Sequence, residues 1–249
     1  MNTASASPVN SMPQVSPPGR RVIDAPTRML HWLLALSFSG AYLSAESERW
    51  HAVHITLGYT VIGLVLARVL WGLLGPKRVR FGSWASKLRG LPQQMLAWPQ
   101  GRGNALASFQ GLNTLLAVAL LLAALAAALS GLGLEQEWGG ARVEDLLEDV
   151  HELLGNTTLA VVLGHIGLIL GISLLRRQNH ASPMLSGRTP GAGPDLVKQN
   201  LRPLAALLLV AVLSFWTWQW QQGSLATTER PGISARHTGS DQGSDDGDD

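Results

Sequence analysis

The chain has 249 residues and no cysteine, and only 14% of its residues are charged, against roughly 25% in an ordinary soluble domain. The absence of cysteine excludes disulfides, thiolate zinc sites, cysteine-ligated iron–sulfur clusters and covalently attached c-type haem, so any cofactor must be held by other side chains. Hydrophobic residues make up 46% of the chain and gather in its middle, which argues against a disordered or nucleic-acid-binding chain. The net charge of +2 is too small to identify a partner.

Five apolar segments approach the length of about 20 residues that a membrane-spanning helix needs. Tryptophans stand at the ends of several segments, as expected at a membrane–water interface. The sequence therefore predicts an all-α membrane protein, with a four-helix transmembrane bundle followed by a fifth, C-terminal transmembrane helix. In chain order, the predicted spans are 29–45, 55–75, 112–134, 153–175 and 203–220.

The polar segments divide the chain and predict its orientation. Residues 1–21 are expected to form a disordered cytoplasmic leader, 22–188 the four-helix domain, 189–222 a linker with the fifth helix, and 223–249 an acidic, disordered periplasmic tail. Lys and Arg gather in the leader and in the segments between the second and third and between the fourth and fifth spans. Because cytoplasmic loops retain basic residues, we expect a multi-pass protein of the bacterial inner membrane with a cytoplasmic N-terminus and a periplasmic C-terminus.

Four histidines lie in the spans or at their mouths, where polar groups usually face a bundle interior or a ligand. His151 and His165 are 14 residues apart on one predicted helix, so they share a face at depths about 21 Å apart. The alternating direction of the spans places His31 at the level of His165 and His54 at the level of His151. His51 is an alternative to His54 as the partner of His151 at the periplasmic level. It follows Arg49 and Trp50 in the loop, so we favour His54.

Two histidine pairs at two depths are what two non-covalent b-type haems require, because haem iron accepts two axial imidazoles. A metal transporter fits less well, since hard or borderline cations usually call for carboxylates and the predicted spans contain none. A haem-free membrane scaffold or transporter, with its histidines satisfied by hydrogen bonds between helices, is a further alternative.

Two arginines and a set of glycines complete the predicted cofactor site. Arg68 follows His54 by 14 residues and is predicted to bind a haem propionate at the inner level, with snorkelling to the cytoplasmic surface as its alternative. Arg28 is a second candidate for binding a propionate. It is equally well explained as one of the basic residues that set the orientation of the protein in the membrane. Small residues leave room either for the edge of a macrocycle or for close helix packing; they are Gly40, Gly58, Gly155, Gly164, Gly167 and Gly171.

An ordered set of motifs between Val22 and Arg188 resembles the bacterial cytochrome b561 family, which includes the b-type cytochrome subunits of nickel–iron hydrogenases. The region 101–104 departs from the family's Gly-His-Asn-Pro stretch. The resemblance implies a four-helix bundle with two non-covalent b haems, and its axial ligands map to His31, His54, His151 and His165. The matching motifs are Pro26-Thr27-Arg28, His31-Trp32, His54-Ile55-Thr56-Leu57-Gly58-Tyr59, Arg68, Trp71-Gly72, Arg80-Phe81, His151-Glu152, His165 and Pro183-Met184-Leu185-Ser186-Gly187.

The resemblance also implies electron exchange with quinone or with a periplasmic redox protein such as a cytochrome c. The acidic residues from Glu135 to Asp149, together with the tail, are expected to steer a basic carrier. Two other functions stay open: a membrane-anchor subunit of a hydrogenase or another dehydrogenase, and a stand-alone quinone oxidoreductase acting on a small substrate such as superoxide. The sequence does not choose between an enzyme and a pure electron carrier.

Overall fold

The computed structural model describes residues 19–77, 79–97, 99–100, 102–191 and 193–228. This part of the chain is almost entirely helical, with one short two-stranded antiparallel sheet in which Arg20 pairs with Thr189. The elements, in chain order, are β1 (Arg20–Arg21), α1 (Ala25–Ser44), the 3₁₀ helix η1 (Glu48–Trp50), α2 (His51–Leu74), α3 (Phe81–Ala97), α4 (Ala105–Glu135), α5 (Ala141–Arg176), α6 (Ser182–Ser186), β2 (Arg188–Thr189) and α7 (Arg202–Thr228).

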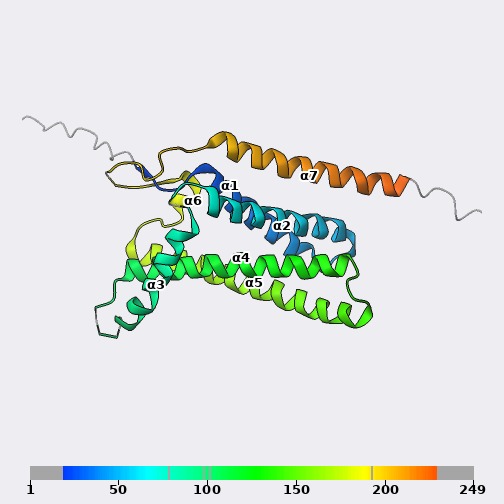
Figure 1. Ribbon diagram of the computed structural model, residues 1–249, viewed down its shortest axis with the longest axis horizontal. Helices are drawn as coiled ribbons and strands as arrows, with labels where there is room; N and C mark the ends of the chain where they lie inside the picture. Colours follow the sequence, from blue (N-terminus) through cyan, green and yellow to red (C-terminus); the bar gives the residue numbers. More distant parts are fainter. Residues whose placement is uncertain (1–18, 78, 98, 101, 192, 229–249) are drawn as a thin grey trace, which may run out of the picture.

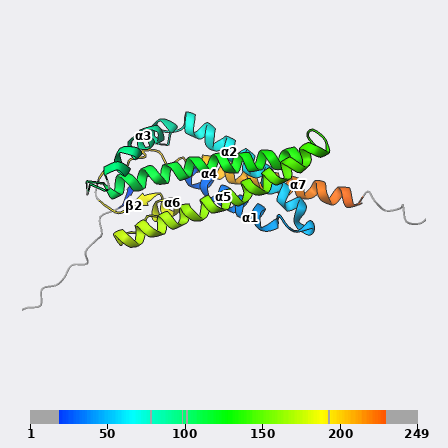
Figure 2. The same ribbon diagram turned by 90° about the horizontal axis from the view of Figure 1, so that it is seen from below.

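Five long helices run alongside one another and make up the body of the molecule (Figure 1). α4 packs along α5, α1 packs along α2, and α2 joins the two pairs through its contact with α4. α7 lies against α1 and α2, on the side away from α4 and α5 (Figure 1), and in the view from below most of it is hidden behind the other helices (Figure 2). α1, α2, α4 and α5 therefore form the predicted four-helix bundle, and α7 is added to its outside.

In the part of the chain that the structure describes, four helices are long and apolar enough to cross a membrane: Glu48–Leu74, Leu106–Glu135, Ala141–Arg176 and Arg202–Gln222. The chain is therefore a multi-pass membrane protein. α1 is not among these four, because Arg28, His31 and several serines lower its hydropathy. The predicted span at 29–45 forms a helix, but its crossing of the membrane stays a prediction.

The helices continue beyond the apolar runs from which they were predicted. α5 begins at Ala141, ten residues before His151, so the acidic residues Glu144 to Asp149 lie on its first turns and not in a loop. α7 continues to Thr228, past the expected start of the tail at residue 223. Arg20 and Arg21, which we assigned to a disordered leader, form β1. The rest of the predicted leader, 1–18, and the tail residues 229–249 lie outside the described residues.

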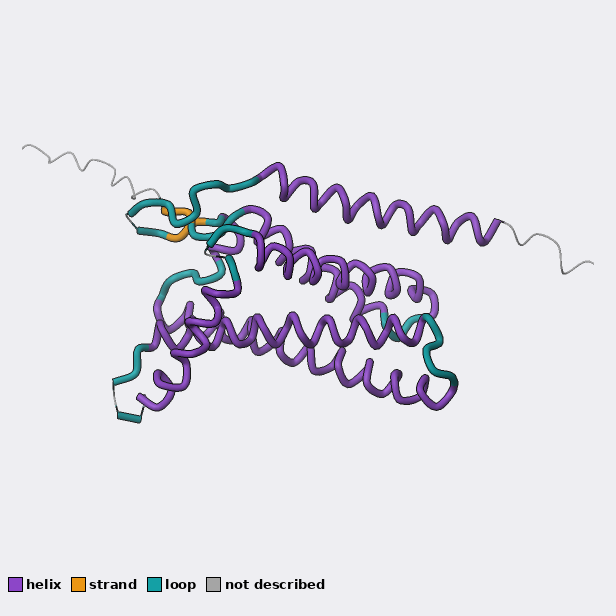
Figure 3. The backbone as a smooth tube through the Cα atoms, in the orientation of Figure 1, coloured by secondary structure: helices purple, strands orange, loops and turns teal. Residues whose placement is uncertain are grey.

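Loops, the sheet and two short helices gather at one end of the bundle (Figure 3). The amphipathic helix α3 was not predicted, because its apolar residues are too few for a span; it packs against α4 at this end. Asn104 caps α4, since its side chain accepts hydrogen bonds from the backbone N–H groups of Leu106 and Ala107. Asn104 belongs to the stretch 101–104, in which the sequence departs from the cytochrome b561 pattern. In this chain, the side chain of Asn104 caps the start of α4.

The best-buried apolar cluster lies between α1, α2 and α7. Leu30 and Leu33 of α1 meet Leu64 of α2 and Val212 of α7, and all four are buried. The indole of Trp216 on α7 also donates a 2.9 Å hydrogen bond to the hydroxyl of Thr60 on α2. The C-terminal helix is therefore a packed part of the structure.

Candidate haem site

His54 of α2 and His151 of α5 lie beside each other. Their ring centroids are 5.9 Å apart and the two ring planes are nearly perpendicular, at 83°. Two imidazoles bound to opposite sides of one metal have centroids about 6 Å apart, because each nitrogen lies about 2 Å from the metal. The separation therefore suits two axial ligands of one iron.

The hydrogen bonds of this pair fix which ring nitrogen is available to a metal. The Nδ1 atoms of His54 and His151 each lie 2.8 Å from a backbone carbonyl oxygen, that of Ala41 and that of Ala127 respectively. A carbonyl oxygen only accepts, so both Nδ1 atoms carry the proton and both Nε2 atoms keep a lone pair. Metal-binding histidines usually have this second hydrogen bond, because it holds the ring in position.

Gly131 of α4 provides the space in which the His151 ring lies. A Cβ atom at this position would be 2.8 Å from Cε1 and 3.1 Å from Nδ1 of His151. Ser130, the preceding residue, places its hydroxyl oxygen 3.2 Å from the same Nδ1. α4 therefore positions this histidine through a carbonyl, a hydroxyl and a glycine, and sequence reasoning did not single out any of these groups.

His31 of α1 and His165 of α5 form the second pair. Their ring centroids are 6.5 Å apart with an interplanar angle of 57°. The Nδ1 atom of His165 is buried and has no hydrogen-bond partner among the described residues. The structure therefore brings together both predicted pairs. The two pairs are separated along α5 by 14 residues of continuous helix, or about 21 Å.

The chemistry of these side chains fits a haem better than a bare metal ion. Among the described residues, no three His, Cys, Asp or Glu side chains come together as a metal site. A bare ion needs four or more protein ligands or waters, whereas a haem supplies four ligands from its own ring and needs only two from the protein. Two separate, half-buried histidine pairs are therefore suited to two haems.

The remaining described histidines lie elsewhere. His51 is exposed and its Nε2 atom lies 3.9 Å from a carboxylate oxygen of Glu135, so the structure places His54, and not His51, beside His151. His180 lies edge-on to the ring of Phe109, 5.4 Å between centroids. Neither histidine faces another imidazole in the described part of the chain.

Arg68 of α2 is buried beside two aromatic residues at the start of α3. Its guanidinium lies over the ring of Trp84, 4.7 Å from the centroid, and over that of Phe81 at 5.4 Å. Such contacts stabilise a cation, yet its Nη1 atom is buried and has no hydrogen-bond partner among the described residues. The group does not reach the surface as a snorkelling arginine would, and it retains a donor for an acidic ligand. The sequence did not predict the aromatic cover.

Arg28 connects the first helix to the segment after α5. Its Nη1 atom donates a 2.7 Å hydrogen bond to the carbonyl of Leu185, and the indole of Trp32 donates to that of Met184 at 3.1 Å. Gly187, at φ 77°, packs against Arg28. Two motifs of the cytochrome b561 pattern that are far apart in sequence are therefore in contact. The Nε atom of Arg28 is buried without a partner among the described residues, so it is available to a propionate. That role stays a prediction.

The glycines divide into two groups. A Cβ atom at Gly40 would lie 2.7 Å from a methyl group of Leu57, so this glycine serves close packing of α1 on α2. The others have no neighbour within 4 Å of such a Cβ atom, so helix packing does not require them. They are Gly58, Gly155, Gly164, Gly167 and Gly171.

Asp24 is a buried acidic residue that sequence reasoning missed. It is fully buried at the start of α1, where its Oδ1 atom accepts from the backbone N–H of Thr27 and its Oδ2 atom from the indole of Trp71. The hydrogen bond from Trp71 ties the start of α1 to α2. An Asp followed two residues later by a Pro before an apolar run is a signal for a helix cap, but this signal does not predict burial.

Substitution of Asp24 separates its two roles. We expect Asp24→Asn to retain the helix cap through its amide oxygen and to lose the acceptor for the Trp71 indole, because its second polar group is an NH2 donor, and so to lower the thermal unfolding temperature in detergent. Asp24→Ala loses the cap as well and is expected to cost about 1 kcal/mol more. Equal unfolding temperatures for Asp24→Asn and the wild type would contradict a stabilising role for the hydrogen bond from Trp71.

Comparison with known proteins identifies the family of the chain. The family model for prokaryotic cytochrome b561 matches residues 22–187, about two thirds of the chain. No curated protein and no solved structure matches the chain. The match covers α1 to α6 and all four paired histidines, and it ends before α7. The chain therefore belongs to the prokaryotic cytochrome b561 family and is a membrane b-type cytochrome of electron transfer.

Proposed function

We propose that this protein is a dihaem cytochrome b that transfers electrons between membrane quinone and a redox protein at the periplasmic face. The observation that carries this proposal is the pairing of four histidines at two levels of one helical bundle, His54 with His151 and His31 with His165. A transmembrane electron path needs a redox centre near each side of the bilayer, and two pairs about 21 Å apart along α5 meet that need.

In this proposal the protein holds and orients its cofactors through neutral imidazoles. The pairs His54–His151 and His31–His165 would each hold one haem, and a bound haem would supply one-electron redox chemistry. The carbonyls of Ala41 and Ala127 keep Nδ1 protonated in the outer pair, and so present Nε2. Arg68 and Arg28, each with a buried nitrogen that lacks a partner among the described residues, are the proposed donors to propionates.

The distribution of charge supports the proposed orientation. Basic residues lie at the end of the bundle that carries β1, α3, α6 and the start of α7, where the N-terminal segment meets the α5–α7 connection. Acidic residues lie at the other end, on the connection between α4 and α5 and the first turns of α5. Since basic residues stay in the cytoplasm, we propose that the His54–His151 pair lies toward the periplasm and that α1 is a fifth span.

The acidic end also indicates the kind of redox partner. Glu144, Asp145, Glu148 and Asp149 are all exposed on α5, within ten residues of His151. A basic one-electron carrier such as a cytochrome c would be attracted to this surface. Quinol oxidation releases two electrons and two protons, so two such carriers would be reduced for each quinol and the protons would pass to water.

The test uses purified full-length protein in lipid nanodiscs. We expect a pyridine haemochrome assay to give two b haems per chain, and a reduced quinol to reduce both and then a basic cytochrome c. The rate of the second step is expected to fall as salt rises, and to fall at low salt in the variant Glu144→Gln/Asp145→Asn/Glu148→Gln/Asp149→Asn.

Three outcomes would contradict parts of this proposal. Protein without haem, made with adequate haem supply, would leave the histidines as packing groups. Reduction only in the presence of a co-purified dehydrogenase or hydrogenase would assign the chain as an anchor subunit. Turnover of quinone with superoxide in the absence of any protein partner would assign it as a stand-alone oxidoreductase.

A further inference from the structure

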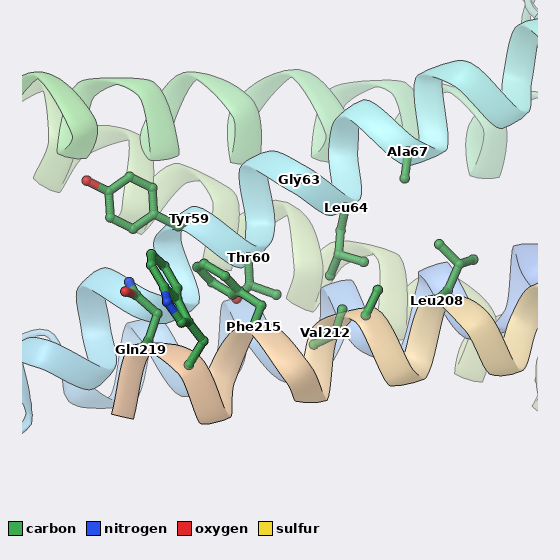
Figure 4. A pocket seen from close by; sticks show the side chains of 11 residues that line it. Tyr59, Thr60, Gly63, Leu64, Ala67, Leu208, Val212, Phe215 and Gln219 are labelled. Carbon is green, nitrogen blue, oxygen red and sulfur yellow. The ribbon is translucent and has the colours of Figure 1, made fainter. Parts of the chain in front are cut away.

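A groove of about 650 Å³ runs between α2 and α7. This volume is within the range of small-molecule sites, about 300–1,000 Å³. Tyr59 and Gln219 lie at one end of the groove and Ala67 and Leu208 at the other (Figure 4). Gly63 forms part of the floor, and a Cβ atom there would meet nothing within 4 Å. The groove is therefore long and apolar, with polar groups at one end only.

The polar end offers hydrogen-bonding groups that the protein itself does not use up. The hydroxyl of Tyr59 accepts from the side-chain amide of Gln136 at 3.4 Å, and its own proton has no acceptor among the described residues. The amide of Gln219 likewise has no partner in the described part of the chain. Thr60 differs, because its hydroxyl donates to the carbonyl of Thr56 and accepts from Trp216. Tyr59 and Gln219 are thus left to bind a ligand.

The lining indicates a neutral ligand with a polar head and an apolar tail. None of the eleven lining residues is charged. Anionic phospholipid head groups favour basic pockets, and this lining has no basic residue, so the groove does not suit them. Both α2 and α7 are candidate membrane spans, which gives a lipid-soluble molecule direct access. A quinone ring has two carbonyl oxygens for the two donors, aromatic neighbours in Phe215 and Trp218, and an isoprenoid tail for the apolar end.

The polar end of the groove also lies near the outer histidine pair. Tyr59 follows His54 by five residues on α2, a rise of about 7.5 Å. The two side chains point to nearly opposite sides of that helix, and a helix with its side chains is about 10–12 Å across. A ligand in the groove would therefore be separated from a haem at His54 by about one helix.

We propose that the groove between α2 and α7 binds a membrane quinone, with Tyr59 and Gln219 as hydrogen-bond donors to its carbonyl oxygens. The redox role of this site rests on the proposed function, whereas the binding itself does not. Half of the site is supplied by α7, which lies outside the matched family region. The site is therefore a feature of this chain and its particular C-terminal helix.

The binding test uses the full chain in nanodiscs and ubiquinone with a single isoprene unit as the probe. Trp218 lines the groove, so saturable quenching of tryptophan fluorescence reports binding. We expect Gly63→Leu, which fills the groove, to abolish saturable quenching. Tyr59→Phe and Gln219→Leu each remove one hydrogen bond and are expected to raise the Kd about three- to tenfold. Ala206→Leu, on an exposed position of α7 outside the groove, is the matched control and should bind as the wild type does.

Haem content and quinol-driven reduction, measured on the same samples, separate the two proposals. Unchanged quenching in Gly63→Leu would overturn the groove as the quinone site, and the proposed function would stand if quinol still reduced two haems. If Gly63→Leu loses the quenching and neither the wild type nor the variant binds haem, the quinone site would be supported and the dihaem function overturned. Quenching that never saturates in the wild type would also overturn the site, because the probe would then only partition into lipid.

Discussion

Replacement of His54 by alanine is expected to reduce the haem content of the purified protein from two haems to one. The ring of His54 lies 5.9 Å from that of His151 between centroids, and a haem at this pair would lose one of its two axial ligands. The His31–His165 pair is a separate site on the same bundle, so its haem should remain. The measurement is a pyridine haemochrome assay together with the dithionite-reduced minus oxidised spectrum.

His51→Ala is the control for this prediction. His51 is exposed, lies three residues from His54, and has its imidazole beside Glu135 and not beside His151, so the variant should retain two haems. His165→Ala is expected to lose the other haem, and the double variant with His54→Ala should lose both. Added imidazole should restore haem binding in His54→Ala if the loss is one of ligation and not of folding. Two haems retained in His54→Ala would refute the assignment of this residue as a ligand.

Gly131→Ala is expected to weaken the outer haem site without the removal of any ligand. The new methyl group would lie 2.8 Å from Cε1 of His151, closer than side chains tolerate, so the imidazole must move. That movement breaks the 2.8 Å hydrogen bond from Nδ1 to the carbonyl of Ala127. Loss of such an orienting bond typically costs 10–100-fold in metal affinity, so the rate of haem transfer to apomyoglobin should rise by about that factor for one of the two haems.

Gly133→Ala is the matched control on the same helix. Its methyl group would lie 3.1 Å from a methyl carbon of Leu147 and 3.2 Å from a ring carbon of Trp138, and the flexible end of Leu147 can give way. We expect the haem transfer rates of this variant to equal those of the wild type. Equal rates for Gly131→Ala and Gly133→Ala would mean that the position of the His151 ring does not determine haem retention.

The levels of the four histidines could be predicted from sequence because they depend on helix geometry. A spacing of 14 residues returns a side chain to nearly the same face of a helix, and the alternation of apolar runs fixes which ends of neighbouring helices meet. His31 and His165 are 134 positions apart in the chain, and they come together because α1 and α5 each cross the bundle once. No feature of packing was needed for that inference.

The surroundings of the histidines could not be predicted in the same way. Gly131 and the carbonyls of Ala41 and Ala127 contact the outer histidines through backbone positions, and such positions carry no side-chain signal in the sequence. Trp84 covers Arg68 because α3 folds back on α2, and α3 is amphipathic and too polar to resemble a span. Its position is set by contacts between helices, which hydropathy does not report.

The sequence by itself determined the class of this protein: a helical membrane protein without cysteine, with four histidines arranged in two pairs and the motifs of a b-type cytochrome. These features follow from local composition and from the fixed repeat of the α-helix. Only the tertiary structure decided how α7 packs on α1 and α2, and hence the groove with Tyr59 and Gln219. Helices in a membrane associate through the detailed fit of their surfaces and not through hydrophobicity, so an apolar segment alone does not indicate which neighbour it will contact.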